Sequence, residues 1–490
     1  MRADIKGTSI SESSKIRALC EQFWEIERQF DLFNKKIDNI DFWILLRVSL
    51  FSAICEQKGV YGSAQDNLSS KSIVDKLLIV SGAIKNFFLN KPFNTSSKKF
   101  FFVGHPRRKY IDGLWWDLYV DPILDKMEMD YYFLEHPYLG RHFTPAKSSD
   151  IKFIDLQDTF IRWKSSRSRV KLTREDESFI QQIEDAVNSR FGVCCDIEKM
   201  VHKRVPLHKM YEKFYFRLLS KVRPSIMFLV VNYLPSSFAL TSVCKRLGIP
   251  VVELQHGTIF KNHMGYSFPD LNIKCKYHPD YIFTFGDFWK NGIQFPIPSD
   301  KVLTMGYPFF SERVSKLRAD AQNKNVITFI SQGTIGKELA KIALRLRNKL
   351  SSDYTINYKL HSSEYSSWRK SYEGLDSSPG INVIENDKQD LYETMVGSEL
   401  IVGVYSTALY EAIALGVPVV LIDLPGIDSM ETLIDLCPEI VINGEDDIVQ
   451  LSKEGFKNAS KIDKEFIFET AWMENLSVNV DRILKRNSSS

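Results

Sequence analysis

The sequence lacks several features that would place a protein in a specialised class. Its net charge is only +3 over 490 residues, so there is no general excess of positive charge for nucleic acid. No run reaches the ~18 uninterrupted apolar residues that a membrane span needs, and the first residues lack the apolar core of a signal peptide. The seven cysteines show neither Cys-x-x-Cys pairs nor zinc spacing. They are typical of reduced thiols, and we expect a cytoplasmic protein.

The chain does contain enough apolar material for more than one core. With 490 residues, of which 44% are hydrophobic, it predicts two α/β domains and an accessory segment. We expect a helical N-terminal region at 1–95, a first α/β domain at 96–308 and a second at 309–475. The end of the last helix and a polar tail would occupy 476–490.

Apolar residues recur at helical spacing in the N-terminal region. Residues 15–56 predict two helices joined near Asn34, and residues 72–88 predict a third. Residues 42–54 are the most apolar early stretch, but they contain Arg47. We predict a buried helix there, with contact to a membrane interface as the open alternative.

The most informative stretch is 402–423, VGVYSTALYEAIALGVPVVLID. A strand ends at Tyr405, and Ser406 or Thr407 can then cap a helix. Gly416 ends that helix before a short apolar strand. The unpaired N–H groups at such a helix start carry roughly half a positive charge, which favours a phosphate.

Glu411 lies one helical turn after Thr407, on the same side of the predicted helix. A carboxylate at this place could bind the two hydroxyl groups of a ribose. The spacing alone equally allows an ordinary capped helix that carries a solvated glutamate.

This segment resembles the donor-binding motif in the C-terminal domain of GT-B glycosyltransferases. It is similar to the bacterial capsule and lipopolysaccharide enzymes, including the polysialyltransferase and CDP-glycerol glycerophosphotransferase-like groups, which carry a Ser/Thr pair followed by Glu-Ala and Gly-x-Pro-Val-Val. The resemblance covers about the last half of the chain. It implies an α/β GT-B fold, with two Rossmann-like domains facing across a cleft and a helical N-terminal extension. It also implies that Ser406, Thr407 and neighbouring Tyr405 hold donor phosphates, that Glu411 holds the ribose, and that the last helix, at 466–483, returns to the first domain.

A second motif, Gln255-His256-Gly257, follows a predicted buried strand at 251–254. Because Gly257 permits a tight turn, the side chains before it would be presented at the carboxyl edge of the sheet. The motif resembles the equivalent loop of the same glycosyltransferases, which lines the gap between their domains. His256 could deprotonate an acceptor hydroxyl, hydrogen-bond a donor phosphate or brace the loop.

Other polar residues also follow predicted strands of the first domain. His105 follows a strand at 99–103 and could be an acid, a base, a phosphate ligand or a solvated loop residue. Glu135 and His136 follow the strand at 131–134, and adjacent residues of an extended chain point to opposite sides. The catalytic base therefore stays open among His256, His105, Glu135, His136 and Asp287.

Two loops of the second domain are candidates for the donor site. Gln332, Gly333 and Thr334 follow a strand at 326–330 in a turn that is neither a Walker sequence nor Gly-x-Gly-x-x-Gly, but whose N–H groups can cradle a pyrophosphate. Lys359 and His361 end the next strand, where the related families often have Lys/Arg-x-His-Pro. This chain has Ser362 in place of that proline.

The resemblance implies a metal-independent glycosyltransferase of surface-polysaccharide biosynthesis, such as capsule, lipopolysaccharide or O-antigen. It would move a sugar from a nucleotide-sugar, most often a CMP- or UDP-sugar, to a growing glycan or lipid-linked acceptor, with possible contact at the inner face of the plasma membrane. No separate cofactor is expected, since a helix N-terminus and basic groups can offset the charge of the leaving group. The alternatives are a UDP-N-acetylglucosamine 2-epimerase-like enzyme, a CDP-glycerol-type polymer phosphotransferase and a non-catalytic scaffold. The sugar, the linkage and retention or inversion stay open.

Overall fold

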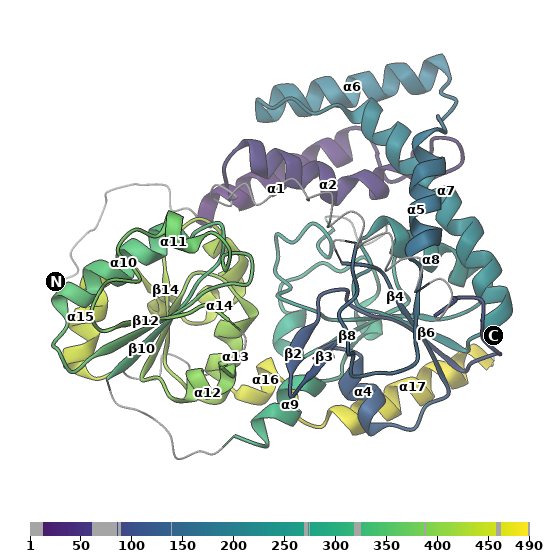
Figure 1. Cartoon of the computed structure of the whole chain (residues 1–490). Helices are drawn as coiled ribbons and strands as arrows, with labels where there is room; N and C mark the ends of the chain where they lie inside the picture. Colours follow the sequence, from purple (N-terminus) through teal and green to yellow (C-terminus); the bar gives the residue numbers. More distant parts are fainter. Residues whose placement is uncertain are drawn as a thin grey trace.

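A computed structural model describes most of the chain. The described residues are 13–60, 86, 90–138, 140–268, 273, 275–317, 325–386, 389–456 and 462–488. Figure 1 shows two α/β domains side by side, with helices of the N-terminal region placed along one side of both.

The first sheet has seven parallel strands in the order β5-β4-β1-β6-β7-β8-β9. Their bounds are Phe100–Val103 (β1), Tyr131–Glu135 (β4), Ile151–Phe153 (β5), Ile226–Leu229 (β6), Val251–Leu254 (β7), Tyr281–Thr284 (β8) and Val302–Thr304 (β9). Four of them, β1, β6, β7 and β8, are buried along their whole length, as expected for parallel strands that are covered on both faces.

The second sheet has six parallel strands in the order β12-β11-β10-β13-β14-β15. Their bounds are Val326–Ile330 (β10), Thr355–Lys359 (β11), Ile381–Ile384 (β12), Leu400–Gly403 (β13), Val419–Ile422 (β14) and Val441–Ile442 (β15). In both sheets the strand order reverses once, between β1 and β6 and between β10 and β13. This is the order of a Rossmann-like domain, and ligands of such domains bind at the carboxyl ends of the strands beside the reversal. The predicted class of two Rossmann-like domains is confirmed.

Helices cover the faces of both sheets (Figure 1). Those of the first domain are α4 (Asp121–Lys126), α5 (Asp155–Ser166), α6 (Arg174–Phe191), α7 (Ile197–Val222), α8 (Pro235–Arg246) and α9 (Pro308–Val314). Those of the second domain are α10 (Gly336–Lys349), α11 (Trp368–Ser371), α12 (Leu391–Val396), α13 (Thr407–Leu415), α14 (Glu431–Leu436) and α15 (Glu445–Glu454).

The N-terminal region contributes α1 (Ser13–Gln29) and α2 (Phe42–Gln57), joined through Asn34 as predicted. They pack with α6 and α7 around one apolar cluster. Arg47 of α2 is fully buried: its Nε lies 2.6 Å from Glu27 Oε1, and its guanidinium donates to the carbonyls of Met264 and Ser267. The predicted burial of this helix is confirmed.

The remaining predicted helix of this region, at 72–88, lies outside the described residues except for Asn86. Among the residues that the structure describes, no helix combines the length and apolarity of a membrane span.

The C-terminal segment returns to the first domain, as the resemblance implies, but in two pieces. The predicted helix at 466–483 is α16 (Lys464–Ile467), an extended turn and α17 (Trp472–Ser488). The turn binds the first domain instead of continuing the helix: the Glu469 N–H donates to the Phe285 carbonyl at 2.8 Å. A side chain at Gly286 would lie 2.4 Å from the Ile467 carbonyl oxygen, so glycine is needed for this approach. Leu476 and Ile483 of α17 then join the core of the first sheet.

A hairpin of the first domain escaped the sequence analysis. β2 (Lys109–Ile111) and β3 (Leu114–Trp116) pair antiparallel around Asp112 and Gly113, whose φ angles are 50° and 84°. Two successive positive φ angles define the turn that Asp-Gly favours, so the dipeptide was a usable signal.

Candidate functional site

Helix α13 starts beside the strand reversal of the second sheet. Ser406 is its N-cap, and the Ser406 Oγ accepts a hydrogen bond from the Ala408 N–H at 3.2 Å. Gly416 ends the helix in the left-handed conformation, with φ 81°. The predicted cap and stop are both confirmed.

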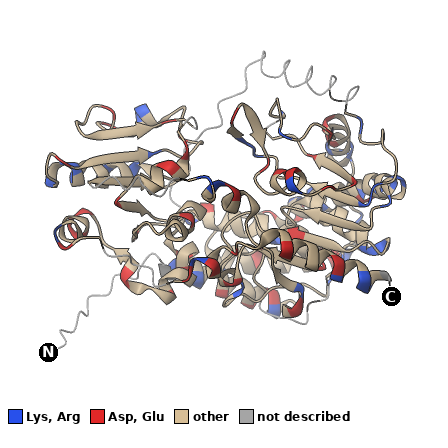
Figure 2. Cartoon of the chain, turned by 90° about the horizontal axis from the view of Figure 1, so that it is seen from below, with Lys and Arg blue, Asp and Glu red and all other residues tan. Residues whose placement is uncertain are grey.

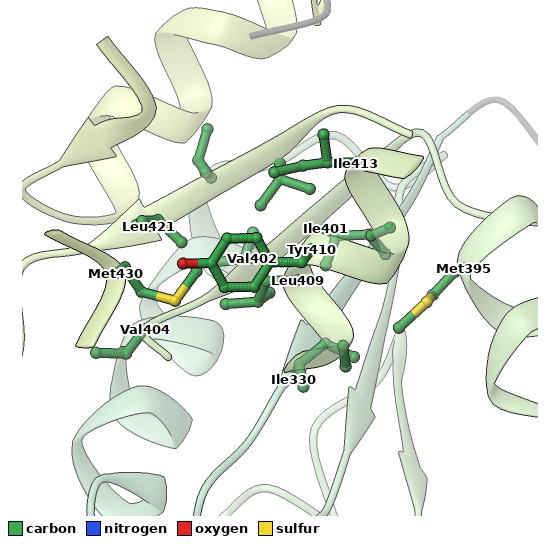
Figure 3. Packing of buried hydrophobic residues seen from close by; sticks show 14 of the residues in the cluster. Ile330, Met395, Ile401, Val402, Val404, Leu409, Tyr410, Ile413, Leu421 and Met430 are labelled. Atoms are coloured by element: carbon green, nitrogen blue, oxygen red, sulfur yellow. The ribbon is translucent and has the colours of Figure 1, made fainter. Parts of the chain in front are cut away.

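The direction of α13 is fixed by its apolar side. Figure 3 shows Leu409 and Tyr410 packed over Val402 of β13, within the core of the second domain. The Tyr410 ring also contacts Trp289 of the first domain, with 4.7 Å between ring centroids. The helix therefore packs on both domains, with its N-terminus at the edge between them.

Several hydroxyl groups surround this N-terminus. Thr334, in the loop after β10, is hydrogen-bonded to the Tyr405 hydroxyl in the loop after β13, so the bond spans the strand reversal. Ser406 and Thr407 are half-buried, as are Gln332 and Gly333. The residues predicted on these two loops are therefore brought together at one partly open place.

The loop after β11 is held mainly by its own contacts. The Lys359 ammonium donates to the Tyr365 hydroxyl at 2.8 Å and to the Asn386 carbonyl at 2.9 Å. His361 Nδ1 lies 2.7 Å from the Ser363 hydroxyl. Lys359 thus leans toward the loop after β12, while His361 stays at the end of its own strand.

Glu411 is not a solvated helix residue. Its side chain is 7% exposed and is hydrogen-bonded to the Tyr392 hydroxyl of α12. Burial raises the pKa of Glu411 to about 7, and the nearby cation of Lys109, from the first domain, offsets part of this effect. The carboxylate therefore lies where the two domains meet, and the alternative of an ordinary surface glutamate is excluded.

Across from α13, the carboxyl edge of the first sheet carries two of the predicted histidines. His105 follows β1 and His256 follows β7, and their rings lie 6.0 Å apart. The His256 Nε2 is 3.0 Å from the hydroxyl of Tyr233, which follows β6. Burial lowers the pKa of His105 to about 4, so both an uncharged imidazole and a phenol face this edge.

The loop that carries His105 is shaped by a buried carboxylate. Asp117 accepts hydrogen bonds from the backbone N–H groups of His105, Tyr119 and Val120. A side chain at Gly104 would lie 2.4 Å from the Asp117 Oδ2, which explains why this strand ends in glycine.

The hydrogen bonds around His256 bear on which ring nitrogen carries its proton. The Tyr266 hydroxyl donates to Glu253 Oε1 at 2.8 Å, and the same oxygen accepts from the Asn232 N–H at 3.0 Å. The Tyr266 oxygen is then free to accept from the Nδ1–H of His256, at 3.3 Å. This network favours the proton on Nδ1, with the Tyr233 hydroxyl at Nε2, and the ring is also hydrogen-bonded to the backbone of Val230.

Burial, with the neighbouring His105 and His263, lowers the pKa of His256 to about 3, so the ring is neutral. Glu253, Tyr233 and Tyr266 were not among the site residues predicted from the sequence. Glu253 was detectable, since it is the one charged residue of β7 and stands two residues before Gln255 on the same side of the strand.

Replacing Tyr266 by phenylalanine should change this tautomer. Without the phenol oxygen, Nδ1–H loses its acceptor and the proton should move to Nε2, where the Tyr233 oxygen can accept it. Nitrogen-15 resonances of labelled histidine report the two forms directly. A wild-type His256 with its proton on Nε2 would contradict the assignment.

The two edges face each other. A side chain at Gly257 would come within 3.9 Å of the Thr407 hydroxyl, so the His256 loop lies directly opposite the start of α13. Asn262 of the same loop donates to Glu431 of the second domain at 2.9 Å. This is the GT-B arrangement that the resemblance implies.

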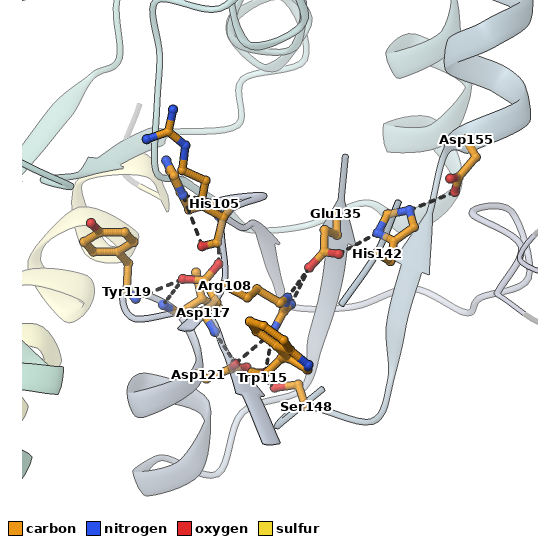
Figure 4. A network of polar contacts seen from close by, with 12 residues as sticks. His105, Arg108, Trp115, Asp117, Tyr119, Asp121, Glu135, His142, Ser148 and Asp155 are labelled. Carbon is orange, nitrogen blue, oxygen red and sulfur yellow. Dashed lines mark hydrogen bonds and ion pairs between the residues drawn. The ribbon is translucent and has the colours of Figure 1, made fainter. Parts of the chain in front are cut away.

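Glu135 has a different environment from the one predicted for a catalytic group (Figure 4). It is 1% exposed, with one oxygen 2.5 Å from Arg108 Nε and the other 2.5 Å from His142 Nδ1. The other ring nitrogen of His142, Nε2, lies 2.9 Å from Asp155 Oδ2. Although burial opposes it, hydrogen bonds to Asp155 and Glu135 raise the pKa of His142. Both carboxylate oxygens are bound inside the first domain, so Glu135 does not face α13.

The other two candidates are also engaged elsewhere. His136 Nε2 contacts the Tyr215 hydroxyl of α7 at 3.0 Å. The Asp287 carboxylate is bound by the Lys290 ammonium at 2.7 Å and by the Thr304 hydroxyl. His256 and His105 remain as the groups that face α13.

Replacement of Glu135 by glutamine should cost about 3–5 kcal/mol of unfolding free energy, because it leaves the buried Arg108 without one carboxylate partner. Urea unfolding of the variant measures this loss. An unchanged unfolding midpoint together with lost turnover would instead return Glu135 to the reaction.

Within the described part of the chain, no group of three or more His, Cys, Asp or Glu side chains is placed to hold a metal ion.

No protein-family model matches the chain, and no curated protein matches it. Similar solved structures include the UDP-GlcNAc 2-epimerase of Neisseria meningitidis bound to UDP-GlcNAc, at 15% identity and TM-score 0.46, over 78% of this chain and 99% of that one. The Methanocaldococcus jannaschii UDP-GlcNAc 2-epimerase in complex with UDP-GlcNAc and UDP is 12% identical, with a TM-score of 0.43, over 78% of this chain and 99% of that one. A variant of the wall teichoic acid polymerase TagF is 12% identical, with a TM-score of 0.42, over 86% of this chain and 99% of that one. These are likenesses of fold, and the chemistry of the site follows from its own residues.

Proposed function

We propose that the chain is a glycosyltransferase of surface-polysaccharide synthesis. It moves a sugar from a nucleotide-sugar to a growing glycan or lipid-linked acceptor. The observation that carries this proposal is the start of α13, where several hydroxyl groups lie close together. This helix start faces the loop of the neutral His256 across the domain boundary. A polar anion site opposite a proton acceptor is what sugar transfer from a phosphate requires.

On the donor side, the N–H groups at the start of α13 and the hydroxyls of Thr334, Tyr405 and Thr407 would hold the phosphates. Glu411 would accept hydrogen bonds from the ribose after exchanging its contact with Tyr392. A CMP- or UDP-sugar is the preferred donor.

On the acceptor side, the lone pair of His256 Nε2 would take the proton of the acceptor hydroxyl after exchanging its contact with the Tyr233 hydroxyl. The oxygen then bonds to the anomeric carbon of the sugar while the bond from that carbon to the donor phosphate oxygen breaks. The nucleotide leaves with the electron pair, and α13 offsets its negative charge. His105, 6.0 Å away, would contact the donor phosphate or the acceptor.

The test has two stages on the full chain. A thermal-shift panel of CMP, CDP, UDP, GDP and their sugars should show one nucleotide that raises the unfolding temperature, since a ligand stabilises the folded state that binds it. With that donor, free nucleotide should appear only when a glycan acceptor is added. Sugar epimerised without acceptor would establish an epimerase, transferred alcohol phosphate a phosphotransferase, and binding without turnover a scaffold; each would overturn the proposal.

A further inference from the structure

One flank of the first domain combines exposed aromatic rings with many exposed Lys and Arg side chains. The stretches Phe160–Lys171 and Lys213–Arg223 contain nine Lys and Arg residues and no Asp or Glu. All nine side chains are exposed: Arg162, Lys164, Arg167, Arg169, Lys171, Lys213, Arg217, Lys221 and Arg223. Since the whole chain carries only +3, the rest of it is net negative. Arg162 is paired with Asp158 at 2.7 Å, while Lys164, Lys213 and Arg217 line one groove.

The aromatic residues of this flank are unusually accessible. Phe160 is 57% exposed, Trp163 52% and Phe216 41%, and the first two rings stack with 5.9 Å between centroids. Cations cover the rings: the Arg167 guanidinium lies 4.3 Å from the Trp163 ring, and the Arg246 guanidinium lies 4.8 Å from the Phe216 ring.

A groove of about 290 Å³ runs between α5 and α7, where the two stretches begin. Its walls are apolar and its rim is cationic, with Phe93, Phe160, Ile161, Phe214, Lys213 and Arg217 among the lining residues. Figure 1 places α5 and α7 on the side of the first domain that faces away from the second domain. This surface, which we call the α5–α7 face, is therefore separate from the candidate site.

We propose that the α5–α7 face docks on an anionic phospholipid membrane. Each Lys or Arg near such a surface strengthens binding by about fivefold, and exposed aromatic rings gain by leaving water for the headgroup region. Long cationic side chains over the rings can keep their charge at the headgroups while the rings enter. A polyanion in solution would use the cations and leave Phe160 and Trp163 in water.

The mixed charge elsewhere makes the face distinctive. Figure 2 shows Lys and Arg interspersed with Asp and Glu over both domains. The proposal does not depend on the transferase assignment, because it concerns a surface outside the site, but docking there would bring the chain to lipid-linked molecules.

Flotation of the full chain with lipid vesicles tests the proposal. The protein should float with phosphatidylcholine vesicles that contain phosphatidylglycerol and not with pure phosphatidylcholine. Lys213→Glu with Arg217→Glu should weaken the partition by at least about thirtyfold. Lys370→Glu with Lys453→Glu makes the same charge change on exposed residues of the second domain and should leave the partition within about twofold of wild type, since these residues lie off the face.

A second pair, Phe160→Ser with Trp163→Ser, should remove the binding that survives high salt. The proposal fails if anionic vesicles do not bind, if neutral vesicles bind equally, or if the control pair loses as much as the Lys213 pair. It also fails if the aromatic pair binds vesicles like wild type while heparin competes fully, because the face would then be a site for free polyanions.

Discussion

Replacement of His256 by alanine is expected to lower turnover by about 10²–10⁴-fold, the usual contribution of a positioned general base. The variant removes the Nε2 lone pair that would take the proton of the acceptor hydroxyl. Release of free nucleotide in the presence of acceptor measures the loss.

The His256 loop should keep its shape in this variant, because other groups hold it. The Gln255 side chain donates to the Gly257 carbonyl at 2.8 Å and accepts from the Phe285 N–H at 2.8 Å. The Tyr119 hydroxyl donates to the His256 carbonyl, not to its ring. Nucleotide affinity should therefore change little. A variant that turns over within threefold of wild type, or that loses donor binding as strongly as turnover, would remove His256 from the role of base.

Replacement of Glu411 by alanine is expected to weaken nucleotide-sugar binding by about ten- to a hundredfold, the effect of losing hydrogen bonds to a charged group. Isothermal titration with the nucleotide-sugar found in the thermal-shift panel measures it. Unchanged affinity would exclude the ribose role.

The same carboxylate makes binding depend on pH. Burial raises the pKa of Glu411 to about 7 in the empty site. Because its folded pKa is above that of an exposed glutamate, Glu411 lowers the free energy of unfolding as pH rises from about 4.5 to about 7, and no further above that. A ribose prefers the ionised carboxylate, so binding should release a proton and affinity should rise with pH up to about 7.

Glu411→Gln is the matched control, since the amide can still bond a ribose but cannot titrate in this range. Its affinity should be nearly independent of pH. A wild-type protein whose affinity for nucleotide-sugar is flat between pH 5.5 and pH 8 would contradict the role given to Glu411.

The parts of the fold that the sequence predicted well are those set by neighbours in the chain. The cap at Ser406 and the stop at Gly416 depend on residues within one turn of helix, so the pattern at 402–423 was sufficient. The sequence places His105 and His256 at the ends of parallel strands. Because parallel strands end at a common edge of the sheet, this placement implies that the two side chains lie near each other, as they do.

What the sequence could not predict depends on partners far along the chain. Glu135 is bound by Arg108 and His142, neither of which is its neighbour in the sequence. The sequence also does not show whether Glu135 or His136 faces the interior, because this depends on how the strand is rotated about its axis. Between α16 and α17 the helix is interrupted, and there the Glu469 N–H donates to the Phe285 carbonyl of the first domain. A contact between residues so far apart in the chain leaves no local sequence pattern.

The central claim is that the start of α13 binds the phosphate of a nucleotide, opposite His256. A crystal structure of the chain with its nucleotide-sugar tests this most directly. We expect phosphate oxygens within hydrogen-bond distance of the N–H groups of Thr407 and Ala408 and of the Thr334 hydroxyl, with the sugar between them and His256 Nε2. A nucleotide bound away from α13, or a sugar turned from His256, would contradict the account.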